Sequence, residues 1–145
     1  MSKKIGLFWL RDDFRFTKNS GLIEATTNHD HVVVFYIYKQ ETYKYQEAQK
    51  WWLSKSLLNF RKKLNDLNMT LEIIEAKSFK IFFDKLIKKK DFTIYWNKVY
   101  EPDYLKFDEY LFGVFKNENI QHKRCKGNAL NEIKDIKKID GTPFK

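Results

Sequence analysis

Polar and aromatic residues able to hold a ligand stand just after three apolar runs of the chain. Asn97 and Glu101 follow the run at residues 92–96, and their amide and carboxylate groups can orient the hydroxyls of a ring or a ribitol chain. Arg11, after the run at residues 4–10, can contact an anionic ligand. Such groups bind and orient a molecule rather than react with it. The residues predicted on this basis are Arg11, Tyr36, Ile37, Tyr38, Trp51, Trp52, Asn97 and Glu101.

Structural roles compete with binding roles at several of these positions. Glu101 precedes Pro102, which fits the first turn of a helix, so the carboxylate can serve as a favourable charge at a helix amino end. Arg11 and Arg15 can pair with Asp12 and Asp13 instead of a ligand, and we expect this pairing.

Several kinds of chemistry have no residues to carry them. With five glycines in all, the chain has neither a dinucleotide-binding glycine motif nor a P-loop. Cys125 is the single cysteine, and no Cys/His cluster has zinc spacing. We therefore predict no catalytic and no metal-ligating residues. A response-regulator receiver is disfavoured as well, because the third predicted strand has no aspartate at its end to accept phosphate.

The hydrophobic pattern predicts alternating strands and helices. Strands are expected at residues 4–10, 31–38, 69–76, 92–96 and 120–125, and helices at 21–27, 46–67, 79–87 and 102–115, with Asn19–Ser20 and Ser78 as caps. Short crossovers that contain helices require parallel strands. The fold class is therefore α/β: a doubly wound, mostly parallel five-stranded sheet with helices on both faces, a Rossmann-like three-layer sandwich.

This fold places ligands outside the carboxyl ends of the strands, where the strand order reverses. Those ends carry Arg11, the Tyr36–Tyr38 segment and the loop from Asn97 to Glu101. Trp51 and Trp52 open the longest helix, and because neighbouring residues are about 100° apart, at least one indole should leave the helix–sheet contact. Together with Tyr36 and Tyr38, these indoles could form an aromatic pocket for a planar ring, although core packing or surface exposure explains them equally well.

Composition limits the partners and the compartment. The 28 Lys and Arg against 19 Asp and Glu give a net charge of +9, but the cations are mostly scattered lysines without the basic and aromatic interleaving of a nucleic-acid groove. No apolar run approaches the ~18 residues of a membrane span, and no signal peptide is evident. We expect a cytoplasmic protein that does not contact a membrane.

Four segments, in order, resemble the DNA photolyase and cryptochrome family. WLRDDFRF at residues 9–16, followed by Asn19 and Leu22, is similar to the family's W-F-R-R-D-L-R-L-x-D-N-x-x-L, with Asp12 and Lys18 as departures. Residues 52–64 resemble the helix F-L-x-x-S-L-x-x-L-x-x-x-L, residues 95–102 resemble Y-W-N-x-x-Y-E-P, and residues 141–144 resemble G-x-P-Y. Trp9, in the first of these segments, joins the predicted site residues.

The resemblance implies an amino-terminal α/β domain at residues 1–130, followed at 131–145 by the start of a linker. In the family this domain often carries a light-harvesting antenna, which is methenyltetrahydrofolate, a deazaflavin or FMN. FAD and the DNA lesion bind a helical domain, which would be a partner on the same or a separate chain. By resemblance the whole protein is a lyase of DNA repair, but this chain alone is not expected to repair DNA.

The family's antenna residues match this sequence only in part. Folate-type members place an Asn-Glu pair after E-P, and these positions resemble Asp103 and Tyr104, which makes Asp103 the candidate pterin-binding carboxylate. Deazaflavin-type members use an Asp and an Arg at positions that resemble Val99 and Gln49. The antenna type therefore stays open, and so do two alternative functions: a generic nucleotide- or small-molecule-binding module, and a structural interaction domain.

Overall fold

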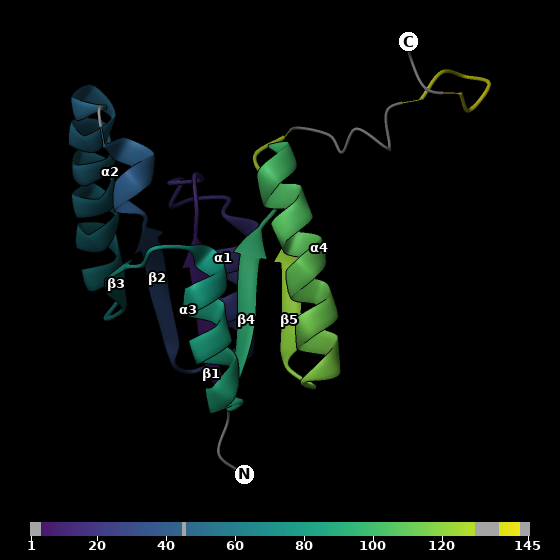
Figure 1. Cartoon of the computed structure of the whole chain (residues 1–145), viewed down its shortest axis with the longest axis horizontal. Coiled ribbons are helices and arrows are strands. Elements are labelled where there is room, and N and C mark those ends of the chain that lie inside the picture. Colours follow the sequence, from purple (N-terminus) through teal and green to yellow (C-terminus); the bar gives the residue numbers. More distant parts are fainter. Residues whose placement is uncertain (1–3, 45, 130–136, 143–145) are drawn as a thin grey trace.

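A parallel sheet with helices on both faces forms the body of the protein (Figure 1). A computed structural model describes residues 4–44, 46–129 and 137–142. The strands are β1 (Ile5–Leu10), β2 (Val32–Tyr38), β3 (Thr70–Glu75), β4 (Phe92–Asn97) and β5 (Gln121–Cys125). The helices are α1 (Ser20–Asn28), α2 (Glu47–Asn65), α3 (Phe79–Leu86) and α4 (Pro102–Asn117), with short 3-10 turns η1 (Gln40–Tyr43) and η2 (Ile87–Lys89).

The strand order is β3-β2-β1-β4-β5, and every neighbouring pair is parallel. The predicted doubly wound α/β fold is thus confirmed. The chain moves outward from β1 through β2 to β3 and then crosses to the other side of β1 to form β4. The carboxyl ends of β1 and β4 therefore meet at the point where the strand order reverses, with Trp9 in register with Trp96.

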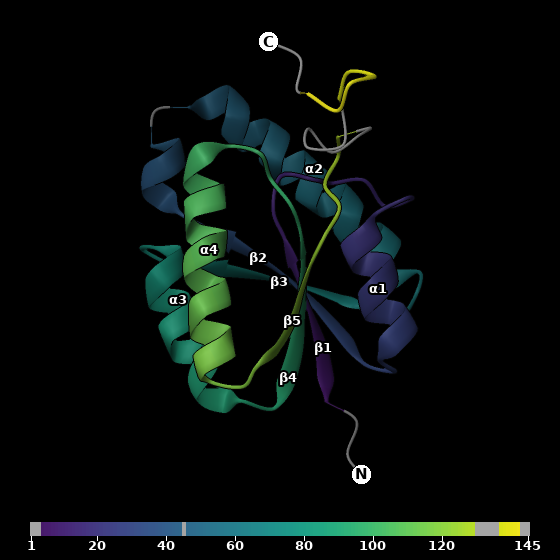
Figure 2. The same ribbon diagram turned by 90° about the vertical axis from the view of Figure 1, so that its right-hand side faces the viewer.

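The helices α1 and α3 lie on opposite sides of the sheet (Figure 2). Alternation along the strands divides the core between these two faces into two layers. Phe8 and Leu10 pack with the buried side chains of α1 and α2, whereas Trp9 packs with those of α3 and α4. In β2 the continuous apolar run is buried on both faces, as expected of a central parallel strand. Two layers of apolar side chains thus fix how the helices lie on the sheet.

Local signals in the sequence set several helix ends. The Asn19 side chain accepts a hydrogen bond from the Leu22 backbone N–H at 3.2 Å, and Ser78 does the same for Ile81 at 3.2 Å, so both predicted caps are confirmed. The long helix α2 ends at Asn65, two residues short of the prediction, and Leu67 is exposed rather than part of its apolar side. Residues 131–136 and 143–145 of the predicted linker lie outside the described residues.

Two helical glycines differ in the space around them and give a matched test of this packing. A Cβ at Gly21 would lie 2.6 Å from the Phe8 ring and 2.7 Å from Asn97 Oδ1, whereas a Cβ at Gly113 would meet nothing within 4 Å. We expect Gly21→Ala to lower the free energy of unfolding by about 1–3 kcal/mol. Gly113→Ala should raise it by about 1 kcal/mol through helix propensity. Urea unfolding followed by circular dichroism measures both, and equal effects would contradict the assigned packing.

Candidate functional site

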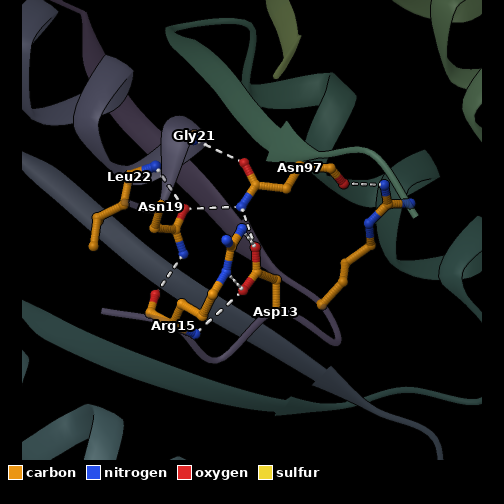
Figure 3. A network of polar contacts seen from close by, with 7 residues as sticks. Asp13, Arg15, Asn19, Gly21, Leu22 and Asn97 are labelled. Atoms are coloured by element: carbon orange, nitrogen blue, oxygen red, sulfur yellow. Dashed lines mark hydrogen bonds and ion pairs between the residues drawn. The ribbon is translucent and has the colours of Figure 1, made fainter. Parts of the chain in front are cut away.

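Asn97, at the end of β4, holds the loop after β1 and the start of α1 together (Figure 3). Its Oδ1 accepts a hydrogen bond from the Gly21 N–H at 2.7 Å. Its Nδ2 donates to Asn19 Oδ1 at 2.8 Å and to Asp13 Oδ2 at 3.3 Å. Because the amide is buried and both of its donors are engaged, Asn97 positions the carboxyl edge, and its side chain is directed at protein partners.

Arg11 forms a buried ion pair with Asp108 of α4. Nη1 lies 2.9 Å from Oδ1 and Nη2 lies 3.3 Å from Oδ2, and Nη2 also donates to the main-chain oxygen of Asn97. The side chains of Arg11 and Asp108 are 2% and 0% exposed, and Arg124 adds a second cation 3.2 Å from Asp108. Burial lowers the pKa of Arg11, and the Asp108 carboxylate opposes this shift.

The expectation that Arg11 pairs with Asp12 or Asp13 is wrong. Alternation along β1 turns Arg11 to the same face as Trp9, toward α4, so its guanidinium meets Asp108. The matching expectation for Arg15 is confirmed, since Nη2 lies 2.7 Å from Asp13 Oδ2. The missed signal was in α4, where Asp108 shares the buried stripe of Leu111 and Phe115.

An aromatic pocket lies at the carboxyl edge, between the chain after β2 and the starts of α3 and α4. Its cavity of about 410 Å³ is lined by Lys39, Glu41, Thr42, Lys77, Ser78, Phe79, Lys80, Asp103, Tyr104 and Phe107. Lys39 Nζ lies 4.1 Å from the centre of the Phe79 ring. Asp103 is exposed, in the first turn of α4, and adds a carboxylate to the aromatic lining.

Trp9 and Arg11 stand behind this aromatic pocket rather than in its lining. The Trp9 and Phe79 ring centres are 5.1 Å apart. The Arg11 guanidinium lies 4.8 Å from the Trp9 ring centre and 5.0 Å from that of Tyr104. Both predicted residues thus support the wall of the pocket and fix its aromatic side chains.

Glu101 lines a separate cavity over the loops that follow β1 and β4. Glu101 is the residue before α4, but its side chain makes no capping hydrogen bond. The cavity measures about 500 Å³ and is lined by Asp12, Asp13, Lys98, Val99, Tyr100, Glu101, Pro102 and Asn128. Glu101 and Asp103 therefore mark two neighbouring hollows on the carboxyl edge.

The predicted aromatic group around β2 and α2 is not gathered into one pocket. Tyr36 is buried in the core beside Phe14, with ring centres 6.1 Å apart, and Ile37 is buried on the opposite face of the sheet. Trp51 and Trp52 are 57% and 66% exposed, because α2 turns Leu57, Phe60 and Leu64 toward the sheet instead. Tyr38 lines a third hollow, between α2 and β3, that neither indole lines.

In the part of the chain that the structure describes, neither a reactive thiol nor a cluster of metal ligands is found at the carboxyl edge. Cys125 is buried, and burial raises the pKa of its thiol to about 11. Among the described residues, no group of three or more His, Cys, Asp or Glu side chains could hold a metal ion. Within the same residues, no helix is both long and apolar enough to cross a membrane.

The sheet order and the switch point between β1 and β4 define a domain of the doubly wound α/β class, with hollows close to the edge where such domains bind ligands. The sequence profile of the DNA photolyase family matches residues 6–145, nearly the whole chain. The chain belongs to the DNA photolyase family, and the resemblance seen in its sequence is confirmed.

Known proteins agree with this assignment. The chain is 24% identical over 139 residues to a deoxyribodipyrimidine photo-lyase of Agrobacterium fabrum, covering 96% of this chain and 29% of that protein. A class III photolyase of Agrobacterium tumefaciens superposes with a TM-score of 0.84 at 23% identity, over 99% of this chain and 30% of the other. An archaeal photolyase of Sulfolobus tokodaii, solved with two FAD molecules, superposes with a TM-score of 0.76 at 23% identity. The match covers 88% of this chain and 30% of the other. The chain thus spans less than a third of the length of these relatives.

Removing the acid of the buried ion pair tests its structural role. Asp108→Asn leaves the Arg11 guanidinium buried without a counter-charge, so the free energy of unfolding should fall by about 3–5 kcal/mol. Glu109→Gln, at the adjacent exposed position of α4, should change it by less than about 0.5 kcal/mol. Urea unfolding compares the two variants. If Asp108→Asn is as stable as Glu109→Gln, the ion pair does not hold α4 to β1.

Proposed function

We propose that this chain is the antenna-binding, amino-terminal domain of a light-dependent DNA repair flavoprotein or cryptochrome. The observation that carries the proposal is the aromatic pocket with the Asp103 carboxylate at its rim. A planar heteroaromatic ring can stack against Phe79, Tyr104 and Phe107. The carboxylate can accept hydrogen bonds from ring N–H or amino groups.

The residues of the aromatic pocket favour a folate-type antenna over a deazaflavin or FMN. Asp103 supplies the carboxylate that a pterin ring needs, whereas the position resembling the deazaflavin carboxylate is Val99. Lys39 and Lys77 line the same pocket and can face the carboxylates of a glutamate tail. Methenyltetrahydrofolate is therefore the antenna that we propose for this site.

The other predicted residues take supporting roles in this proposal. Trp9 and Arg11 hold the aromatic wall from behind, and Asn97 fixes the loop from which α4 starts. We place Glu101, which lines the neighbouring hollow two residues before Asp103, at the exposed end of the same ligand. Tyr36 and Ile37 support the edge from within the core.

FAD and DNA are proposed to bind elsewhere. The chain spans about 29–30% of its relatives, so we place the FAD cradle and the lesion contacts in a helical partner domain, on the same or a separate chain. The lone, buried thiol of Cys125 suits a reducing cytoplasm, where we place the protein. Without the partner domain, this chain would gather light but would not repair DNA.

An absorption titration of the purified chain tests the antenna proposal. Binding should shift the absorption band of added methenyltetrahydrofolate above about 350 nm, where protein aromatic groups do not absorb, relative to the spectrum of the free ligand. Asp103→Asn should weaken binding about tenfold or more, since hydrogen bonds to charged groups are worth ~1.5–3 kcal/mol. Glu109→Gln, exposed on the same helix, is the matched control and should leave binding unchanged.

Two results would count against this proposal. If folate, deazaflavin and FMN all fail to give a bound spectrum, the chain alone holds no antenna and is instead a scaffold for the partner domain. If the ligand band shifts on binding but Asp103→Asn binds as tightly as Glu109→Gln, the antenna lies outside the aromatic pocket.

A further inference from the structure

The third hollow, which we call the α2–β3 groove, lies on the opposite face of the sheet from the aromatic pocket. It has a volume of about 280 Å³ and is lined by Tyr38, Lys50, Leu53, Ser54, Leu57, Leu58, Arg61 and Ile73. The family assignment does not explain it, and its residues do not overlap with those around Asp103 or Glu101.

The groove arises because β3 is an edge strand. The helix α2 buries Leu57, Phe60 and Leu64 against the sheet, and among the described residues no strand beyond β3 extends the layer outward. Leu58 and Ile73 are left 54% and 44% exposed on the two walls of the same hollow. Single exposed aliphatic residues are common on protein surfaces, but two that line one concave space give it the apolar surface that ligand pockets use.

The polar groups of the groove carry positive charge and hydroxyls. Lys50 and Arg61 stand about 16 Å apart along α2, at the ~1.5 Å rise per residue of an α-helix. Tyr38 and Ser54 add hydroxyls between them, and none of the lining side chains is a carboxylate. The groove therefore combines an apolar floor with cationic ends.

Both cations are able to receive an anion. Lys50 pairs with Glu47, the neighbouring acid, at 3.0 Å, but the glutamate side chain is 82% exposed, and such surface pairs contribute little to stability. Arg61 donates one hydrogen bond to the Leu71 carbonyl at 3.3 Å, which leaves further donors of its guanidinium for a ligand. An incoming anion can therefore replace Glu47 as the partner of Lys50 without disturbing the fold of α2.

We propose that the α2–β3 groove binds a small amphipathic anion, with an aryl or aliphatic body between Leu58 and Ile73 and an acidic group at Lys50 or Arg61. The volume lies just below the ~300–1,000 Å³ of typical ligand pockets, so the apolar body is small, about three aromatic rings at most. This inference does not depend on antenna binding, because the two sites lie on opposite faces of the sheet.

Fluorescence titration of the full chain with 1-anilinonaphthalene-8-sulfonate tests the proposal. Binding should be one to one and weaker in high salt. The uncharged analogue N-phenyl-1-naphthylamine, which lacks the sulfonate, should bind at least fivefold more weakly. This comparison isolates the contribution of the cations.

Variants inside and outside the groove show where the sulfonate binds. Leu58→Asp and Lys50→Glu should each weaken sulfonate binding at least tenfold. Leu67→Asp and Lys55→Glu make the same changes at exposed positions that do not line the groove. These two variants should leave sulfonate binding unchanged. Circular dichroism confirms that all four variants are folded, and the folate titration serves as an independent readout that none of them should alter.

The proposal is overturned if the groove variants bind the sulfonate like their controls, or if the uncharged analogue binds as tightly as the sulfonate. The first result would place the probe elsewhere on the surface, and the second would make the hollow an apolar surface without anion selectivity.

Discussion

The buried ion pair between Arg11 and Asp108 is the interaction on which the carboxyl edge of this domain depends. It joins the end of β1 to the middle of α4, and the same guanidinium donates to the main-chain oxygen of Asn97 at the end of β4. Two adjacent strands and one helix are thus fixed at a single point. A buried charge is costly without a partner, so α4 must return to this position for Arg11 to remain inside the protein.

This arrangement decides where a ligand can bind. In a doubly wound sheet the expected place is the crevice between β1 and β4. Here the Asn97 side chain, linked to Gly21, Asn19 and Asp13, fills that crevice with protein contacts. The open spaces lie beside it, where Asp103 and Glu101 face two neighbouring hollows. The antenna site that we propose therefore depends on the start of α4 rather than on the strand ends themselves.

The sequence predicted the layers of this fold well, because they follow from local patterns. Alternating apolar runs located all five strands of the described sheet, and the caps at Asn19 and Ser78 set two helix starts. The motifs around residues 9–16 and 95–102 led to the correct family.

The details of the edge could not be predicted in the same way, since they depend on contacts between distant segments. The partner of Arg11 lies 97 residues away, and no local spacing identifies it. Asn97 was recognised as important, but the sequence could not show that its donors are used within the protein. For Trp51 and Trp52, the helix period indicated that one indole must leave the sheet, and only the packing of α2 shows that both do.

The most direct test of this account is an NMR titration of the ¹⁵N-labelled chain with methenyltetrahydrofolate. We predict shifts at the backbone amides of Phe79, Asp103 and Tyr104, while the side-chain NH₂ signals of Asn97 keep their positions and exchange slowly with water. Large shifts or fast exchange at the Asn97 side chain, with no change at Asp103, would contradict the account. They would show that the ligand opens the crevice between β1 and β4.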